Sequence, residues 1–154
     1  MQVYFVIIPL CPPKDGSKSK FVSFLNKHQF KSQRQKRDIR LLNMNTDDIN
    51  RILSRRVTEF DGVFSVDTLP EEPHLLVCNT DASHDPGRHW VCIWAKNGRG
   101  EYFDSFGRRP TDIFECYLNR YCTAWTFNDR QLQSVISKFC GHYCVYYCML
   151  RSTL

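Results

Sequence analysis

Hydrophobic residues in the body of the chain recur first at helical and then at strand-like spacing. Isoleucine and leucine fall on one face of a segment that Asn45 or Thr46 can cap, which predicts a helix through about Arg56. The stretch 60–69 has extended character, and Leu75–Asn79 has the pattern of a short apolar strand. We therefore expect a helix followed by two strands.

A polar loop at residues 80–88 leads into the best-defined pair of strands, at 89–95 and 101–104. Asn97 and Gly98 lie between these strands, and Asn-Gly is a strong signal for a two-residue hairpin turn. The pattern therefore predicts an antiparallel hairpin.

This turn predicts a register in which Lys96 pairs with Arg99. Val91 then lies opposite Asp104, and His89 lies diagonal to that carboxylate on the same face. Diagonal neighbours are about 7–8 Å apart at Cα, which suits a hydrogen bond between an imidazole and a carboxylate. A shift of one residue would place the two side chains on opposite faces of the sheet.

The last third of the chain predicts two helices and a further strand. Residues 110–121 have helical spacing, and residues 122–127 alternate as a strand does. Residues 141–150 are apolar nearly all round, which predicts a buried helix beginning at Cys140. The buried face expected for the first of these helices is Ile113, Phe114, Tyr117, Leu118 and Tyr121.

Charge is distributed unevenly along the chain. Residues 1–40 contain nine Lys or Arg against two acids, whereas residues 41–154 contain twelve against fourteen. We predict a flexible basic N-terminal arm at 1–40 and one domain at 41–154. The arm is a candidate for weak nucleic-acid contact, with a solvated tail as the alternative, through Lys31, Arg34, Lys36 and Arg37.

Eight cysteines raise the question of disulfides. Three of them, Cys140, Cys144 and Cys148, are four residues apart, which on a helix forms one stripe rather than a bridged framework. The apolar stretch 3–10 lacks the features of a secretory signal and is too short to span a membrane. We expect reduced thiols in the cytoplasm, nucleus or a virion rather than secretion, and no membrane contact.

Four polar groups together supply the roles that a thiol hydrolase requires: a nucleophile, a base, a carboxylate and an oxyanion donor. Cys140 would begin the last helix, where free amides favour a thiolate, and His89 is a candidate base. Asp104 could orient the imidazole, and Gln133 with the Cys140 amide could stabilise an oxyanion. Each residue has an ordinary alternative: Cys140 could simply pack a helix, and Gln133 could be an unremarkable loop residue.

Two neighbours of these residues are predicted to lie close to a substrate. Gly141 would leave room for a substrate backbone, and Trp90 follows the candidate base, although it also has the character of a core residue. A metal site is not expected. The stripe formed by Cys140, Cys144 and Cys148 spreads over about 12 Å of helix, which is too long for one ion.

From 75 to 150 the chain resembles the adenovirus-type (adenain-like) cysteine proteases and, more distantly, the Ulp1-type proteases of ubiquitin-like proteins. The resemblance implies an α+β fold, with a mixed sheet packed against a buried C-terminal helix that carries the catalytic cysteine. It implies catalytic His89, Asp104 and Cys140, an oxyanion hole at Gln133, a protein substrate and no cofactor. The matching motifs are Gly87-Arg88-His89-Trp90, Tyr102-Phe103-Asp104-Ser105-Phe106-Gly107, and Gln133 followed by Lys138-Phe139-Cys140-Gly141.

The chain departs from this pattern in two places. Asp104 stands where the adenoviral members have Glu, and only fourteen residues follow Cys140, so the domain at 41–154 is expected to be C-terminally shortened. The expected activity is that of a maturation-type endopeptidase of a virus or mobile element. Two alternatives remain: removal of ubiquitin-like modifiers by the same residues, and an inactive binding module.

Overall fold

The computed structural model describes residues 44–154. A strand-rich core carries three helices, and the elements are those that the hydrophobic pattern predicts, with shifted ends. In chain order they are α2 (Thr46–Leu53), β1 (Phe60–Ser65), β2 (Leu75–Asn79), β3 (Trp90–Lys96), β4 (Arg99–Phe103), α3 (Asp112–Tyr121), β5 (Ala124–Phe127) and α4 (Cys140–Arg151). The predicted arm at 1–40, with its proposed nucleic-acid contacts, lies outside the described residues.

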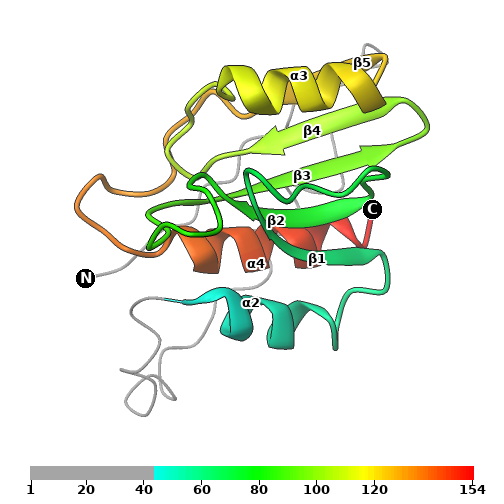
Figure 1. Cartoon of the computed structure of the whole chain (residues 1–154). Coiled ribbons are helices and arrows are strands. Elements are labelled where there is room, and N and C mark those ends of the chain that lie inside the picture. Colours follow the sequence, from blue (N-terminus) through cyan, green and yellow to red (C-terminus); the bar gives the residue numbers. More distant parts are fainter. Residues whose placement is uncertain (1–43) are drawn as a thin grey trace.

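The five strands form one mixed sheet in the order β1-β2-β3-β4-β5 (Figure 1). The outer pairs β1–β2 and β4–β5 are parallel, and the inner pairs are antiparallel. Lys96 pairs with Arg99, and Asn97 and Gly98 both have positive φ, at 52° and 73°, as a two-residue hairpin turn requires. The predicted hairpin and its register are confirmed.

Helices cover both faces of the sheet, so the molecule has three layers (Figure 1). Alternate residues of β2, β3 and β4 face opposite sides, because side chains alternate along a strand. One core lies between the sheet and α4 with α2, and its strand members are Leu75, Val77, Trp90, Cys92 and Phe103. The other lies between the sheet and α3, and its strand members are Leu76, Cys78, Val91, Ile93, Ala95 and Tyr102.

The helices follow their sequence signals except at two points. The Asn45 side chain accepts a hydrogen bond from the Asp48 amide at 2.9 Å and caps α2, which ends at Leu53 rather than near Arg56. In α3 the predicted buried position of Ile113 is wrong, since this side chain is 57% exposed. Phe114 and Leu118, one turn apart, are the residues of α3 that face the sheet and are fully buried.

Among residues 44–154, none of the helices is both long enough and apolar enough to cross a membrane.

Candidate active site

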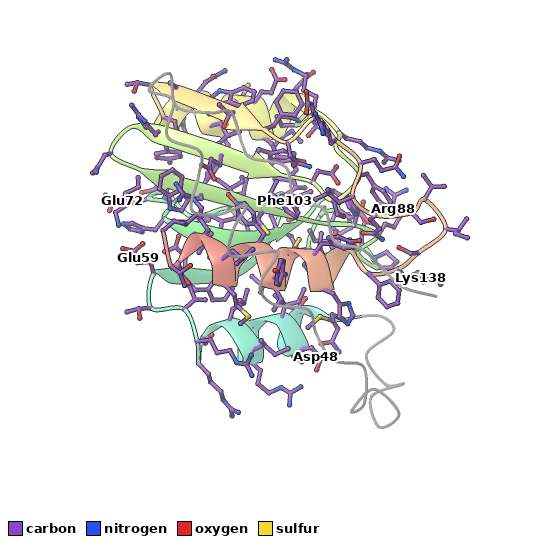
Figure 2. All side chains as sticks on the ribbon, turned by 180° about the vertical axis from the view of Figure 1, so that it is seen from behind. Asp48, Glu59, Glu72, Arg88, Phe103 and Lys138 are labelled. Carbon is purple, nitrogen blue, oxygen red and sulfur yellow. The ribbon has the colours of Figure 1, made fainter. Side chains whose placement is uncertain are left out.

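Three elements meet at one end of the sheet and carry the candidate catalytic residues. His89 immediately precedes β3, Asp104 immediately follows β4, and Cys140 begins α4. Arg88 and Lys138, neighbours of His89 and Cys140, lie together at this end, whereas Glu59 and Glu72 lie at the other (Figure 2). The fold therefore gathers residues separated by up to 51 positions in the chain.

His89 and Asp104 make the contact that the hairpin register predicts. The distance between His89 Nε2 and Asp104 Oδ1 is 2.8 Å, and the two side chains are 13% and 3% exposed. The same carboxylate oxygen accepts a hydrogen bond from the Phe106 amide at 2.8 Å. The Phe106 ring also lies against the imidazole, with 4.8 Å between ring centroids. The carboxylate is thus fixed by its own chain and aimed at the imidazole.

The remaining nitrogen of the imidazole is directed away from Asp104. His89 Nδ1 is buried, and within residues 44–154 it has no hydrogen-bond partner. Burial alone would lower the pKa of His89, but the side chains of Asp104 and Cys140 outweigh that effect and raise this pKa to about 9. Nδ1 is therefore the ring nitrogen that is not engaged by Asp104.

The pKa of Cys140 is shifted in the opposite direction. Burial alone would raise the pKa of its thiol, but the His89 side chain and the backbone amides of Trp90 and Gly141 lower it below the ordinary value. A histidine whose pKa is raised beside a cysteine whose pKa is lowered favours a thiolate–imidazolium pair near neutral pH.

The other cysteines of α4 differ from Cys140. Cys144 and Cys148 are fully buried in the core between α4 and the sheet. The Cys148 sulfur lies 3.8 Å from that of Cys92 on β3, and burial raises the pKa of Cys144. All seven cysteines within 44–154 are free thiols. Among these residues there is no cluster of three or more His, Cys, Asp or Glu that could hold a metal ion.

The loop that leads to His89 is held by two polar contacts. Asp81 is buried and binds Arg88 through both the backbone amide, at 2.8 Å, and the guanidinium, at 2.8 Å from Nη2. Gly87 has a φ of +74°, and a Cβ atom there would lie 2.4 Å from the Asn79 side-chain nitrogen. A glycine with positive φ at this position lets the loop approach β2 closely, and so fixes the position of His89 immediately before β3.

Gln133 lies at the same end of the sheet, in the loop between β5 and α4. Its side chain is 1% exposed and makes two hydrogen bonds. The Ser105 hydroxyl donates to Gln133 Oε1 at 2.7 Å, and Gln133 Nε2 donates to the Ser137 carbonyl at 2.8 Å. Its neighbour Gln131 is exposed and donates to the Gln133 carbonyl at 2.7 Å.

Trp90 and Gly141 are both part of the core beneath the site. The Trp90 indole nitrogen donates to the Met44 carbonyl at 3.2 Å, and the side chain is buried. A Cβ atom on Gly141 would meet Met44 Cβ at 3.0 Å and Ile49 Cδ1 at 3.3 Å. The absent side chain of Gly141 thus makes room for core residues, and its expected proximity to a substrate backbone stays a prediction. The contribution of both residues to the site is their backbone amides beside Cys140.

Two residues of the site were not found by sequence reasoning. Asn128 follows β5, accepts a hydrogen bond from the Asp104 amide at 2.8 Å, and donates to the Asp104 carbonyl at 2.6 Å. Ser105 is fully buried and links the Asp104 segment to Gln133. The position of Ser105 next to Asp104 in the matched motif is a signal that could have identified it. For Asn128 the sequence offers only a turn residue after a strand.

Comparison with known proteins reveals similarity at the level of structure. No family model matches the chain, and no curated protein matches it. A crystal structure of the ASFV pS273R protease matches with a TM-score of 0.55 and 16% identity, over 73% of this chain and 58% of that one. The chain shares the fold of that viral protease.

A second crystal structure of the ASFV pS273R protease, in its selenomethionine form, matches with a TM-score of 0.38 and 24% identity. This match covers 51% of this chain and 34% of that one. The first match confirms the predicted α+β class, in which a mixed sheet packs against a C-terminal helix. The chain spans less than two thirds of the length of the pS273R protease.

Proposed function

We propose that this protein is a cysteine peptidase in which Cys140 is the nucleophile. The observation that carries the proposal is the 2.8 Å contact between Asp104 and His89, at the end of the sheet where Cys140 begins α4. There the pKa of the imidazole is raised to about 9 and the pKa of the thiol is lowered. Cys144 lies four residues further along the same helix, and its pKa is raised. The helix and the residue type therefore do not explain why the pKa of Cys140 is lowered.

The orientation of the imidazole assigns the proton transfers. Asp104 accepts a hydrogen bond from Nε2–H, which leaves Nδ1 of the neutral ring with a lone pair. Nδ1 takes the proton of the Cys140 thiol, and the resulting thiolate attacks the scissile carbonyl carbon. Asp104 stabilises the imidazolium without itself taking the proton.

The remaining steps return the enzyme to its starting state. The tetrahedral intermediate expels the amine, which receives the proton from His89 Nδ1, and an acyl-thioester remains on Cys140. Water then loses a proton to His89 and attacks the thioester. This attack releases a carboxylic acid, and the Cys140 thiolate re-forms. In both tetrahedral intermediates, the Cys140 amide and the free N–H of the Gln133 carboxamide donate to the oxyanion.

The substrate class that follows is a polypeptide. Because the mechanism is common to endopeptidases and to enzymes that remove ubiquitin-like modifiers, the test needs both substrates. We suggest a proteome-derived peptide library, with new N-termini detected by mass spectrometry, and a conjugate of a ubiquitin-like modifier ending in diglycine. Cleavage of the library supports a general endopeptidase, and cleavage of the conjugate alone supports a modifier-specific protease.

The control variants are Cys140→Ala and Cys144→Ala, with a thiol-directed electrophile as a probe that needs no substrate. The proposal expects cleavage by wild type and Cys144→Ala, none by Cys140→Ala, and labelling at Cys140. No cleavage of either substrate, with no preferential labelling at Cys140, would favour an inactive binding module. Unchanged turnover in Cys140→Ala would refute the proposal directly.

A further inference from the structure

Gln133 can stabilise an oxyanion only if its carboxamide presents nitrogen rather than oxygen to the site. The two ends of a carboxamide have nearly the same shape, so its orientation depends on its hydrogen-bond partners. A carboxamide that was free to rotate by 180° would place an acceptor beside the developing negative charge for part of the time and would destabilise it.

The two partners of Gln133 permit one orientation. The Ser137 carbonyl can only accept a hydrogen bond, so the atom 2.8 Å from it must be Nε2. Oε1 then faces the Ser105 hydroxyl, at 2.7 Å, and this hydroxyl must donate because Oε1 carries no hydrogen. Ser105 is 0% exposed and Gln133 is 1% exposed, so water does not compete for either atom.

Ser105 is itself fixed relative to the loop that carries Gln133. The Ser105 carbonyl accepts hydrogen bonds from the amides of Leu132, at 2.8 Å, and Gln133, at 2.9 Å. Ser105 also follows Asp104 directly, so the residue that orients the imidazole and the residue that contacts Gln133 belong to one short segment. Within this segment the Ser105 carbonyl holds the backbone of Gln133 and the Ser105 hydroxyl holds its carboxamide oxygen, while the Ser137 carbonyl selects nitrogen at the other end.

We propose that Ser105 is a positioning residue, whose hydroxyl fixes the Gln133 carboxamide so that one N–H remains for the oxyanion. This inference depends on the peptidase function proposed above. Ser105 does not contact the substrate, so it acts on the rate through Gln133. Loss of the hydroxyl leaves Oε1 buried without a donor and leaves the Ser137 carbonyl alone to hold the carboxamide in the productive orientation.

The test is a set of substitutions assayed on a peptide cleaved by the wild type. Removal of an oxyanion donor costs about 100- to 1,000-fold in kcat, which is the loss expected for Gln133→Ala. Ser105→Ala is expected to lower kcat by about 10- to 100-fold with little change in KM, because it weakens that donor without removing it. The control is Ser134→Ala, an exposed serine in the same loop, which should behave as wild type.

Two further measurements separate positioning from a general structural role. In a Gln133→Ala background, Ser105→Ala should cause no further loss of kcat, because its effect passes through Gln133. Alkylation of Cys140 by iodoacetamide displaces iodide without forming an oxyanion. Its rate should therefore stay within about twofold of wild type in Ser105→Ala. Losses that multiply in the double variant, or slow alkylation in Ser105→Ala, would overturn the inference.

The carboxamide can also be observed without any activity. In the wild-type protein, the Gln133 Nε2 protons should exchange slowly with solvent and show nuclear Overhauser contacts to Ser137, assigned by their loss in Gln133→Ala. Contacts of these protons with the Ser105 side chain instead would mean that the carboxamide is turned over, and would refute the role of Ser105 even if Ser105→Ala does not fold. If wild type and Cys140→Ala show the same activity, the peptidase proposal fails, whereas contacts to Ser137 would still support the fixed orientation.

Discussion

The first turn of α4 and the two turns that follow it carry the same residue type in different surroundings. Cys140, at the N-terminus of the helix, interacts with an imidazole and two backbone amides, and its pKa is lowered. Cys144 lies one turn further on, among core residues beside Cys92, and burial raises its pKa. The comparison shows that environment, rather than residue type or helix, separates a candidate nucleophile from packing cysteines.

Helix position alone does not account for the difference. Both cysteines are more than nine-tenths buried, and burial opposes a thiolate at both. The deciding contribution is His89, which reaches Cys140 because the hairpin register and the Gly87 loop place it at the same end of the sheet.

Substitution of the nucleophile should have the largest effect. Cys140→Ala is expected to lower kcat by about 10⁴-fold or more, as loss of a catalytic nucleophile does elsewhere, whereas Cys144→Ala should retain activity. Steady-state turnover of a cleaved peptide measures both. Comparable losses in the two variants would mean that α4 contributes packing rather than chemistry.

The second prediction concerns the carboxylate, and the chain offers a matched control. Asp61 also contacts a histidine, His74, at 3.2 Å, but this pair is more exposed and lies away from the site. Asp104→Asn should lower kcat by about 100-fold or more, because the neutral partner no longer stabilises the imidazolium. Asp61→Asn should leave kcat unchanged. Equal kcat values for Asp104→Asn and wild type would exclude an orienting role for Asp104.

The pH dependence of turnover should follow the two shifted groups. The pKa of Cys140 is lowered, so the thiolate forms as pH rises through a value below that of an ordinary thiol. The pKa of His89 is raised to about 9, so the imidazolium that protonates the leaving amine is lost above that pH. The profile of kcat/KM should therefore be bell-shaped, with its alkaline limb near pH 9. An alkaline limb near pH 6.5, the ordinary value of histidine, would show that His89 is not shifted.

The smallest effect expected is on stability, where the substitution of Cys144 should have a larger effect than the substitution of Cys140. Cys144→Ala should cost about 1 kcal/mol in the free energy of unfolding, because it leaves a small cavity between α4 and β3. Cys140→Ala should cost less, because it relieves the burial of a charged sulfur. Urea denaturation of the two variants measures the difference. A larger loss for Cys140→Ala would indicate that Cys140 serves mainly as a core residue.

Much of this arrangement could be predicted from the sequence because it depends on local signals. Asn97-Gly98 specifies a turn, the turn specifies a register, and the register places His89 diagonal to Asp104. The apolar run after Cys140 likewise specifies a buried helix. These signals need no knowledge of distant residues.

The features that were missed depend on contacts between distant segments. Asn128 binds the backbone of Asp104 across 24 positions, and Ser105 binds Gln133 across 28. A buried polar side chain is recognised only when its partner is known, and in sequence both have the character of loop residues. The expected burial of Ile113 failed because helical periodicity does not reveal where the covered face of α3 ends.

In the proposed mechanism, His89 makes Cys140 the reactive thiol of this chain. The most direct test is the alkylation rate of each cysteine in the folded protein at neutral pH, resolved by mass spectrometry. Cys116 is exposed, so accessibility alone would make it react before the buried Cys140. We predict that Cys140 reacts first and that His89→Ala removes its advantage. If Cys116 reacts faster than Cys140, or if His89→Ala leaves the Cys140 rate unchanged, the central claim is contradicted.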